Sequence, residues 1–128
     1  MPPLLLIDHH NGVPAYRQIM DQVRLQIATG MLPPGTEMLS TRALSAELAL
    51  NPMTISKAYG LLEHDGVLER RRGQTLVVRE THGEEAHVGR IEPLRNQLIA
   101  AASLARQLSV SRPEALRLFK EILNDETK

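Results

Sequence analysis

The sequence contains no cysteine, and it has no long apolar run. The first absence excludes disulfides and metal sites built on thiolates. The second excludes a transmembrane helix, which needs about 20 apolar residues. The first ten residues, MPPLLLIDHH, also lack the basic segment of a signal peptide, and their apolar stretch is too short for one. These absences predict a cytoplasmic protein with no membrane partner.

An excess of charge of one sign is also missing. Fifteen Lys and Arg residues balance fifteen Asp and Glu residues, so the formal net charge is zero. Neutrality argues mildly against a nucleic-acid-binding protein, but phosphates respond to the local placement of charge. With 128 residues, 42% of them hydrophobic, the chain can form one or two small domains. A second domain large enough for an enzyme does not fit.

The segment from Leu39 to Val78 has the order helix, turn, helix, hairpin. Apolar residues at helical spacing predict a short helix that begins near Thr41. Asn51-Pro52 then ends this helix and starts the next, because asparagine caps helix N-termini and proline is favoured at the first helical position. The second helix is expected to run to about Asp65. Two helices in this order can place the second one in the major groove of DNA.

The second helix has two chemically different faces. Residues spaced three and four apart predict its inward face, which comprises Ile55, Ala58, Tyr59 and Leu62. The opposite surface carries Met53, Thr54, Ser56, Lys57 and Gly60. These side chains are mostly short and polar, so they can approach base edges and phosphates closely.

A basic hairpin follows the second helix. The sequence VLERRRGQTLVV predicts two strands around a turn at Gly73-Gln74. Arg70, Arg71 and Arg72 crowd positive charge at its tip, and an anionic partner would relieve their repulsion. Because strand side chains alternate, Arg70 and Arg72 are expected on one face and Arg71 on the other. The alternative for this segment taken alone is a solvated hairpin tip.

Several motifs in residues 14–78 point to one family. They read P14-A-Y-R-Q-I19, G30-M-L-P-P-G-T-E-M-L-S-T-R-A-L44, N51-P-M-T-I-S-K-A-Y59, L62-E-H-D-G-V-L68 and R71-R-G-Q-T-L-V-V78. In combination they resemble the winged helix-turn-helix domain of GntR-type bacterial transcription regulators. The short remainder and the leading LLLID resemble the YtrA subfamily, in which two helices follow the DNA-binding domain. The expected fold class is therefore mainly α with a small β-hairpin, an N-terminal winged helix-turn-helix followed by a two-helix dimerisation arm.

The resemblance also implies site residues. Arg42 matches an arginine at a helix N-terminus that typically contacts DNA, while Thr54, Ser56 and Lys57 match contact positions on the recognition helix. Gly73 matches the first wing glycine. Together with their neighbours, the predicted DNA-binding residues are Ser40, Thr41, Arg42, Asn51, Met53, Thr54, Ser56, Lys57, Arg70, Arg71, Arg72, Gly73, Gln74 and Thr75.

The sequence departs from the family pattern at three positions. Leu39 stands where the family usually has proline, Ser45 where it has alanine, and Thr75 where it has the second wing glycine. Threonine restricts φ more than glycine does. The depth at which the wing docks on DNA is therefore expected to differ from the family.

The remaining segments are predicted from pattern. Residues 4–8 form a short strand candidate, residues 14–30 a long helix, and the polar stretch 79–87 a linker. A helix over 88–108 ends at Ser109-Val110-Ser111, and a second one restarts there because serine caps it and Glu114 completes a capping box. The predicted domains are 1–80 for DNA binding, 81–87 for the linker and 88–128 for the C-terminal segment.

The two C-terminal helices carry apolar stripes that they cannot bury against each other alone. The stripe residues predicted to form a dimer interface are Ile91, Leu94, Leu98, Ala101, Ala105, Leu108, Leu116, Phe119, Ile122 and Leu123. The alternative is packing onto the chain's own winged helix. Because DNA-binding dimers occupy two half-sites, a detached dimerisation arm is favoured.

No catalytic, metal or cofactor site is predicted. The five histidines lack partners at zinc spacing, and no nucleophile and base form a set. We therefore expect a homodimeric regulator that binds double-stranded operator DNA. The resemblance implies a repressor of its own operon, which in this family often encodes a membrane transporter, and it leaves a small-molecule effector open. The alternative is a winged-helix module that binds a protein partner and uses DNA little; an enzyme fragment fails on length.

Overall fold

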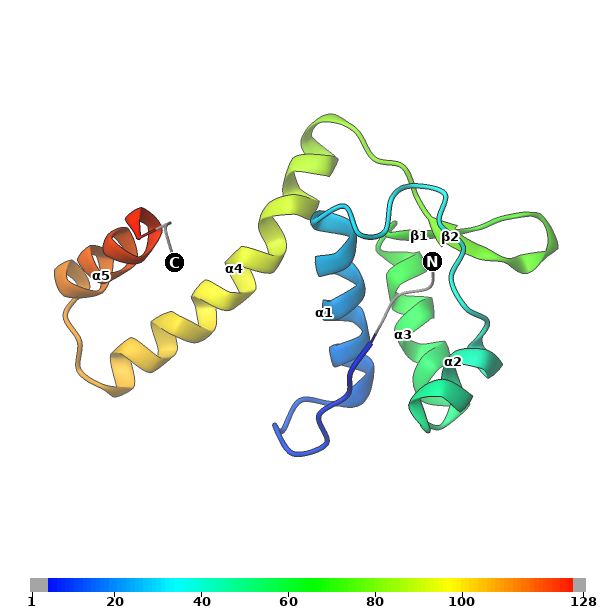
Figure 1. The fold of residues 1–128 in the computed structure, drawn as a ribbon, viewed down its shortest axis with the longest axis horizontal. Coiled ribbons are helices and arrows are strands. Elements are labelled where there is room, and N and C mark those ends of the chain that lie inside the picture. Colours follow the sequence, from blue (N-terminus) through cyan, green and yellow to red (C-terminus); the bar gives the residue numbers. More distant parts are fainter. Residues whose placement is uncertain (1–4, 126–128) are drawn as a thin grey trace. The chain divides into compact units, whose positions relative to one another are not determined.

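Residues 5–125 are described by the structure, which is a computed structural model (Figure 1). The chain divides into two compact units, Met1–Pro93 and Leu94–Lys128. The elements within the described range are α1 (Ala15–Ala28), α2 (Thr41–Leu48), α3 (Pro52–His64), β1 (Leu68–Arg70), a 3₁₀ turn (Arg72–Gln74), β2 (Leu76–Val78), α4 (Gly83–Gln107) and α5 (Arg112–Asn124). The predicted fold class, mainly α with a small β-hairpin, is confirmed.

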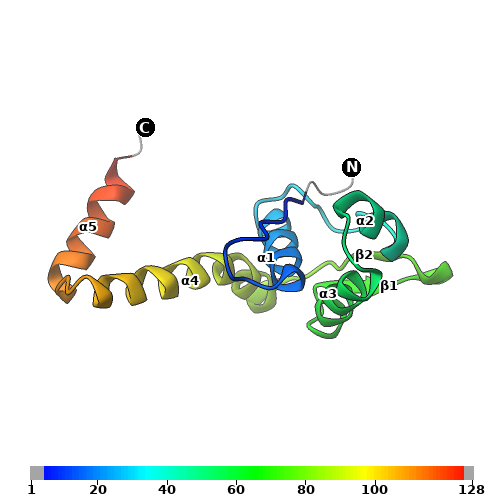
Figure 2. The ribbon, with the colours of Figure 1, turned by 90° about the horizontal axis from the view of Figure 1, so that it is seen from below.

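The core of the first unit lies where α1, α2 and α3 meet the base of the hairpin. Ile19 of α1, Leu44 of α2 and Ile55 of α3 are fully buried, as are Leu68 and Val78 of the two strands. The predicted inward face of the recognition helix is confirmed, since Ile55, Ala58, Tyr59 and Leu62 are the buried residues of α3. In both views the turn of the hairpin projects away from α1 (Figures 1 and 2). The buried core therefore leaves that turn free to meet a partner.

Two side-chain caps define the helix-turn-helix junction. Ser40 Oγ accepts a hydrogen bond from the Ala43 amide at 3.0 Å and starts α2. Asn51 Oδ1 accepts one from the Met53 amide at 2.8 Å, and Pro52 occupies the first position of α3. The predicted junction is confirmed. Such caps are each typically worth about 1 kcal/mol of helix stability.

The strand β2 is bonded along both of its edges. On one edge it pairs antiparallel with β1, in the register Leu68↔Val78 and Arg70↔Leu76. On the other edge, the Met38 amide donates to Leu76 O at 2.8 Å, and the Val78 amide donates to Thr36 O at 2.9 Å. The base of the wing is therefore hydrogen-bonded to the segment that leads directly into α2.

The strand expected over residues 4–8 is wrong for the part of it that the structure describes; Leu4 lies outside the described residues. Residues 5–8 form no strand. Their backbone groups bond instead to two glutamines of α1: Gln22 Nε2 donates to Leu6 O at 2.6 Å, and Gln18 Oε1 accepts from the Asp8 amide at 2.8 Å. Side-chain amides replace the strand edge that this segment would need, and Leu5 is buried in the core.

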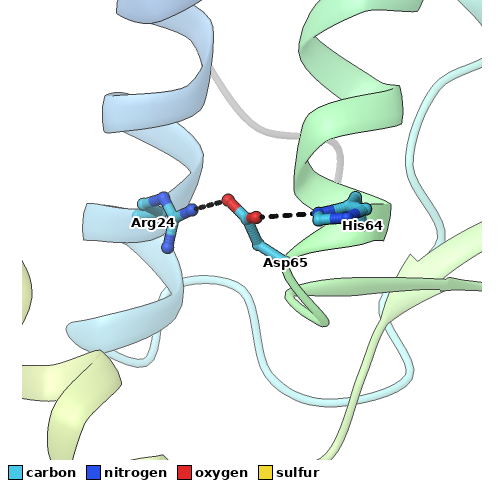
Figure 3. A network of polar contacts seen from close by, with 3 residues as sticks. All are labelled: Arg24, His64 and Asp65. Carbon is cyan, nitrogen blue, oxygen red and sulfur yellow. Dashed lines mark hydrogen bonds and ion pairs between the residues drawn. The ribbon is translucent and has the colours of Figure 1, made fainter.

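An ion pair joins α1 to the C-terminal end of α3 (Figure 3). Arg24 Nη2 lies 2.5 Å from Asp65 Oδ2, and the other carboxylate oxygen lies 3.4 Å from His64 Nδ1. Both partners of the arginine pair are partly exposed, so its contribution to stability is expected to be below about 1 kcal/mol. Its main effect is to fix the end of the recognition helix against α1.

The linker predicted over residues 81–87 is mostly wrong, because α4 begins at Gly83. Glu84 and Glu85 lie in the first turn of the helix, where carboxylates interact favourably with the helix dipole. Glu85 also accepts a 2.7 Å hydrogen bond from Arg79, whose guanidinium donates to Gly66 O at 3.2 Å. The first turn is thus stabilised by charge, and this stabilisation does not require apolar residues at helical spacing.

The second unit consists of the rest of α4 together with α5. Ser111 caps α5 as predicted, with its Oγ accepting a hydrogen bond from the Glu114 amide at 3.3 Å. Neither α4 nor α5 contains a buried residue. The apolar side chains of this unit therefore lack the cover that a folded core provides. Across the described part of the chain, no helix has the length and apolar character to cross a bilayer.

Candidate nucleic-acid interface

The N-terminus of α2 presents one exposed cation beside two hydroxyl side chains. Ser40 is exposed and uses its oxygen to cap the helix, while Thr41 is half-buried. Arg42 is exposed, and it has no ion-pair partner among residues 5–125. The end of the helix that attracts anions through its dipole therefore also carries an uncompensated guanidinium.

The residues predicted to lie on the outward face of α3 are exposed or half-buried. Met53 is 78% exposed, Ser56 and Lys57 are exposed, and Thr54 is half-buried. Asn51, another predicted contact residue, directs its side-chain oxygen to the amide of its own helix. In this structure Asn51 is therefore a cap, with only its amide nitrogen left for a partner.

Lys57 lies over an aromatic ring on a neighbouring helix. Its Nζ is 4.1 Å from the ring centroid of Tyr16 on α1, which is cation–π geometry. The ammonium of Lys57 is therefore turned toward α1. The sequence predicted residues 14–30 only as a long helix, so this contact between two helices was missed.

The wing turn has one position that requires glycine. Gly73 has a φ of 79°, in the left-handed region, and the space around it is open. Thr75, where the family has its second wing glycine, has a φ of −77° and a ψ of 132°, which any residue adopts without strain. The threonine is therefore compatible with the fold of this turn.

The three wing arginines have different surroundings. Arg70 Nη2 lies 3.2 Å from Glu63 Oε1 of α3, and Arg71 Nη2 lies 3.2 Å from Glu69 Oε2 of β1. Arg72 is exposed, and no ion pair to it occurs within the described range. Carboxylates of the chain itself thus relieve part of the crowding that was expected to need an external anion.

The prediction that Arg70 and Arg72 share a strand face is wrong. β1 ends at Arg70, and Arg72 begins the 3₁₀ turn, so the alternation of a strand does not reach it. The physical reason is that the positive φ of Gly73 closes the turn early. Arg72 is consequently the arginine at the turn itself.

A hollow of about 450 Å³ lies between α2, α3 and the wing. Six of the predicted DNA-binding residues line it: Ser40, Thr41, Ser56, Arg70, Gly73 and Thr75. The other predicted residues, apart from Gln74, do not line it; they are Arg42, Asn51, Met53, Thr54, Lys57, Arg71 and Arg72. The side chain of Gln74 is not among those that the structure describes. Three segments separate in sequence are thus brought to one concave surface.

Tyr59 also lines this hollow, although its spacing in the sequence predicted only a core residue. Its hydroxyl donates a 2.8 Å hydrogen bond to the carbonyl oxygen of Leu39. Burial raises the pKa of the Tyr59 hydroxyl well above its usual value, so it stays protonated and able to donate. No pattern of spacing could have found this contact, because it joins residues 20 positions apart.

Residues 15–78 match the family model described as bacterial regulatory proteins, gntR family. The chain belongs to the GntR family. The YtrA repressor of Bacillus subtilis is 30% identical over 122 residues, which are 95% of this chain and 94% of that relative. The family comprises transcriptional regulators with a DNA-binding helix-turn-helix, and they are not enzymes.

Solved structures agree with the assignment. YtrA from Sulfolobus acidocaldarius, a GntR-family transcription factor, is 27% identical and has a TM-score of 0.59, with 97% of this chain and 100% of that chain covered. A GntR family transcriptional regulator from Listeria monocytogenes is 26% identical with a TM-score of 0.68, and the match covers 90% of this chain and 98% of that one. This GntR protein is therefore YtrA-like along most of its length.

Proposed function

We propose that this GntR protein is a dimeric repressor that binds operator DNA in a sequence-specific manner, and that it acts in the cytoplasm where bacterial operators lie. The observation that carries the proposal is the shared hollow, around which the N-terminus of α2, the outward face of α3 and the wing turn meet. The small polar residues on α3 suit close approach to base edges in the major groove. The domain division proposed is 1–80 for DNA binding and 88–128 for assembly.

The exposed cations of α2, α3 and the wing divide by their surroundings. Arg42 and Arg72 are exposed, and no described carboxylate pairs with them, so an external phosphate can neutralise them without breaking an internal contact. Arg71 would first have to leave Glu69. We therefore assign phosphate contacts to Arg42, Lys57 and Arg72, and base readout to Thr54 and Ser56, whose side chains are short.

Dimerisation is proposed through the apolar residues of α4 and α5. These residues are exposed in the single chain, with Leu98 39%, Leu116 64% and Ile122 62% exposed. A second copy would cover them, and two copies would then hold two DNA-binding domains for two half-sites. The proposed interface is Ile91, Leu94, Leu98, Ala101, Ala105, Leu108, Leu116, Phe119, Ile122 and Leu123.

Repression is proposed because the Bacillus subtilis relative that matches over most of the chain is named a repressor. The family resemblance further favours a target operon that contains the protein's own gene and genes for a membrane transporter. A dimer bound across such an operator would exclude polymerase by occupying the promoter.

Alanine substitution of the cations tests the assignment. Arg42→Ala, Lys57→Ala and Arg72→Ala should each weaken operator binding and reduce the dependence of log K on log salt concentration by about one unit, because each removes one phosphate contact. Arg71→Ala, in the same turn, is the matched comparison and should have the smallest effect, because Glu69 already holds that guanidinium. Fluorescence anisotropy at several salt concentrations measures both quantities.

Thermal unfolding of the same variants shows whether the fold is preserved. If all four variants bind with wild-type affinity and slope, this surface is not the interface. That result would favour the alternative, a winged-helix module that binds a protein partner. A different result is that one variant loses its preference for a particular base at one operator position. The missing cation would then be a base contact, whose loss lowers discrimination at that position by about 1 to 3 kcal/mol.

A further inference from the structure

Tyr59 connects the recognition helix to a segment outside it. The residue is 3% exposed, so its ring is part of the core, but its hydroxyl reaches past the core to the Leu39 carbonyl at 2.8 Å. A phenylalanine would fill the same volume without this bond. The hydroxyl therefore makes a contact that the packing of the ring in the core does not require.

Leu39 occupies the joint between the wing and α2. The preceding residues Thr36 and Met38 are hydrogen-bonded to β2 of the wing, through the Val78 amide and Leu76 O. The next residue, Ser40, is the N-cap of α2. The backbone hydrogen bonds to the wing thus end at Met38, and the cap of α2 begins at Ser40. The Tyr59 hydroxyl bonds the Leu39 carbonyl, which lies between the two.

We propose that Tyr59 is a positioning residue for DNA binding, which holds the N-terminus of α2 in register with the recognition helix so that Arg42 meets the DNA backbone. The inference rests on the proposed DNA-binding function. Tyr59 itself does not contact DNA. It acts through the Leu39 carbonyl, because a shift of this segment moves Ser40, Thr41 and Arg42 together.

The test compares the full-length wild type with Tyr59→Phe. Loss of one hydrogen bond that orders a binding segment predicts operator affinity about three- to tenfold weaker. Thr29→Val is the matched control: it removes a hydroxyl that also bonds a backbone carbonyl, Leu25 O at 3.0 Å, but at the C-terminal end of α1. Wild-type affinity in Tyr59→Phe would overturn the inference.

A double-mutant cycle separates positioning from a general loss of stability. If Tyr59 acts through α2, Arg42→Ala should cost less affinity in the Tyr59→Phe background than in the wild type, since Arg42 is already misplaced. Lys57→Ala should cost the same in both backgrounds, because Lys57 and Tyr59 share α3. Additive losses for Arg42 and Tyr59 would reduce Tyr59 to a structural residue and overturn the proposal.

Amide hydrogen exchange in the free protein gives a reading that needs no DNA. In Tyr59→Phe, the amides of Ala43 and Leu44, which bond to Ser40, should exchange faster, while those in the middle of α3 keep their rates. Unchanged exchange at α2 would contradict the inference. Failure of the wild type to bind DNA would instead contradict the proposed function, and exchange would still decide whether Tyr59 orders this segment.

Discussion

A chain ended after Pro93 is expected to be a monomer that binds a two-site operator on the order of 10² to 10⁴ times more weakly than the full-length protein. The expected loss is large because a dimer converts the second half-site contact into an intramolecular one, and no single side chain contributes as much. The shortened chain should still fold, since all of the buried apolar residues in the described range 5–125 lie between Leu5 and Val78.

Analytical ultracentrifugation gives the mass of the shortened chain, and anisotropy gives its affinity. In the full-length chain, Leu98→Glu combined with Leu116→Glu should reproduce the result by placing charge on the apolar faces of α4 and α5, while Gln107→Glu, an exposed polar position, should not. A shortened chain that remained a dimer would place the interface in the winged helix, and the C-terminal helices would then need another role.

The second large effect is expected from Leu44→Ala, which should lower the free energy of unfolding by about 2 to 5 kcal/mol. Leu44 is the only buried residue of α2, and its side chain is fully enclosed. Removing it leaves a cavity beside α3 and detaches the helix that carries Arg42. The Leu44→Ala variant should therefore lose operator binding at a lower temperature than the wild type does.

Urea denaturation of both proteins measures the difference. Leu25→Ala, on the surface of α1 where the residue is 49% exposed, is the matched control and should cost far less. A loss below about 1 kcal/mol for Leu44→Ala would mean that α2 is held by its caps and turns instead of the core.

The helix-turn-helix could be predicted because its signals are local. Asn51 and Pro52 specify a helix start by their own chemistry, and the three- and four-residue spacing of Ile55, Tyr59 and Leu62 specifies the face that packs inward. The structure has both the predicted helix start and the predicted buried face. Where a residue's role follows from its immediate neighbours, sequence was sufficient.

Contacts between distant segments could not be predicted. The glutamines at positions 18 and 22 replace a strand partner for residues 5–8, and nothing in a leading apolar stretch indicates that side chains will satisfy its backbone. The Lys57–Tyr16 contact and the Tyr59–Leu39 bond likewise join separate elements. At Arg72, alternation failed because the chain had already left the strand.

The start of α4 shows a different limit. The stretch from Gly83 to His87 has no apolar period, which favoured a linker. A helix forms there because carboxylates in its first turn and the Arg79–Glu85 pair stabilise it. The periodic spacing of apolar residues reveals helices that pack against a core. It does not reveal helical turns that are stabilised by charge.

The most direct test of the central claim is to let the full-length protein select DNA from a random duplex pool and to sequence what it binds. A dimeric winged helix predicts enrichment of an inverted repeat, with half-site centres about one helical turn apart or a multiple of it. Affinity for the enriched duplex should fall steeply with salt. Failure to enrich any sequence would contradict the claim of sequence-specific DNA binding, and enrichment of a single half-site would contradict the dimer.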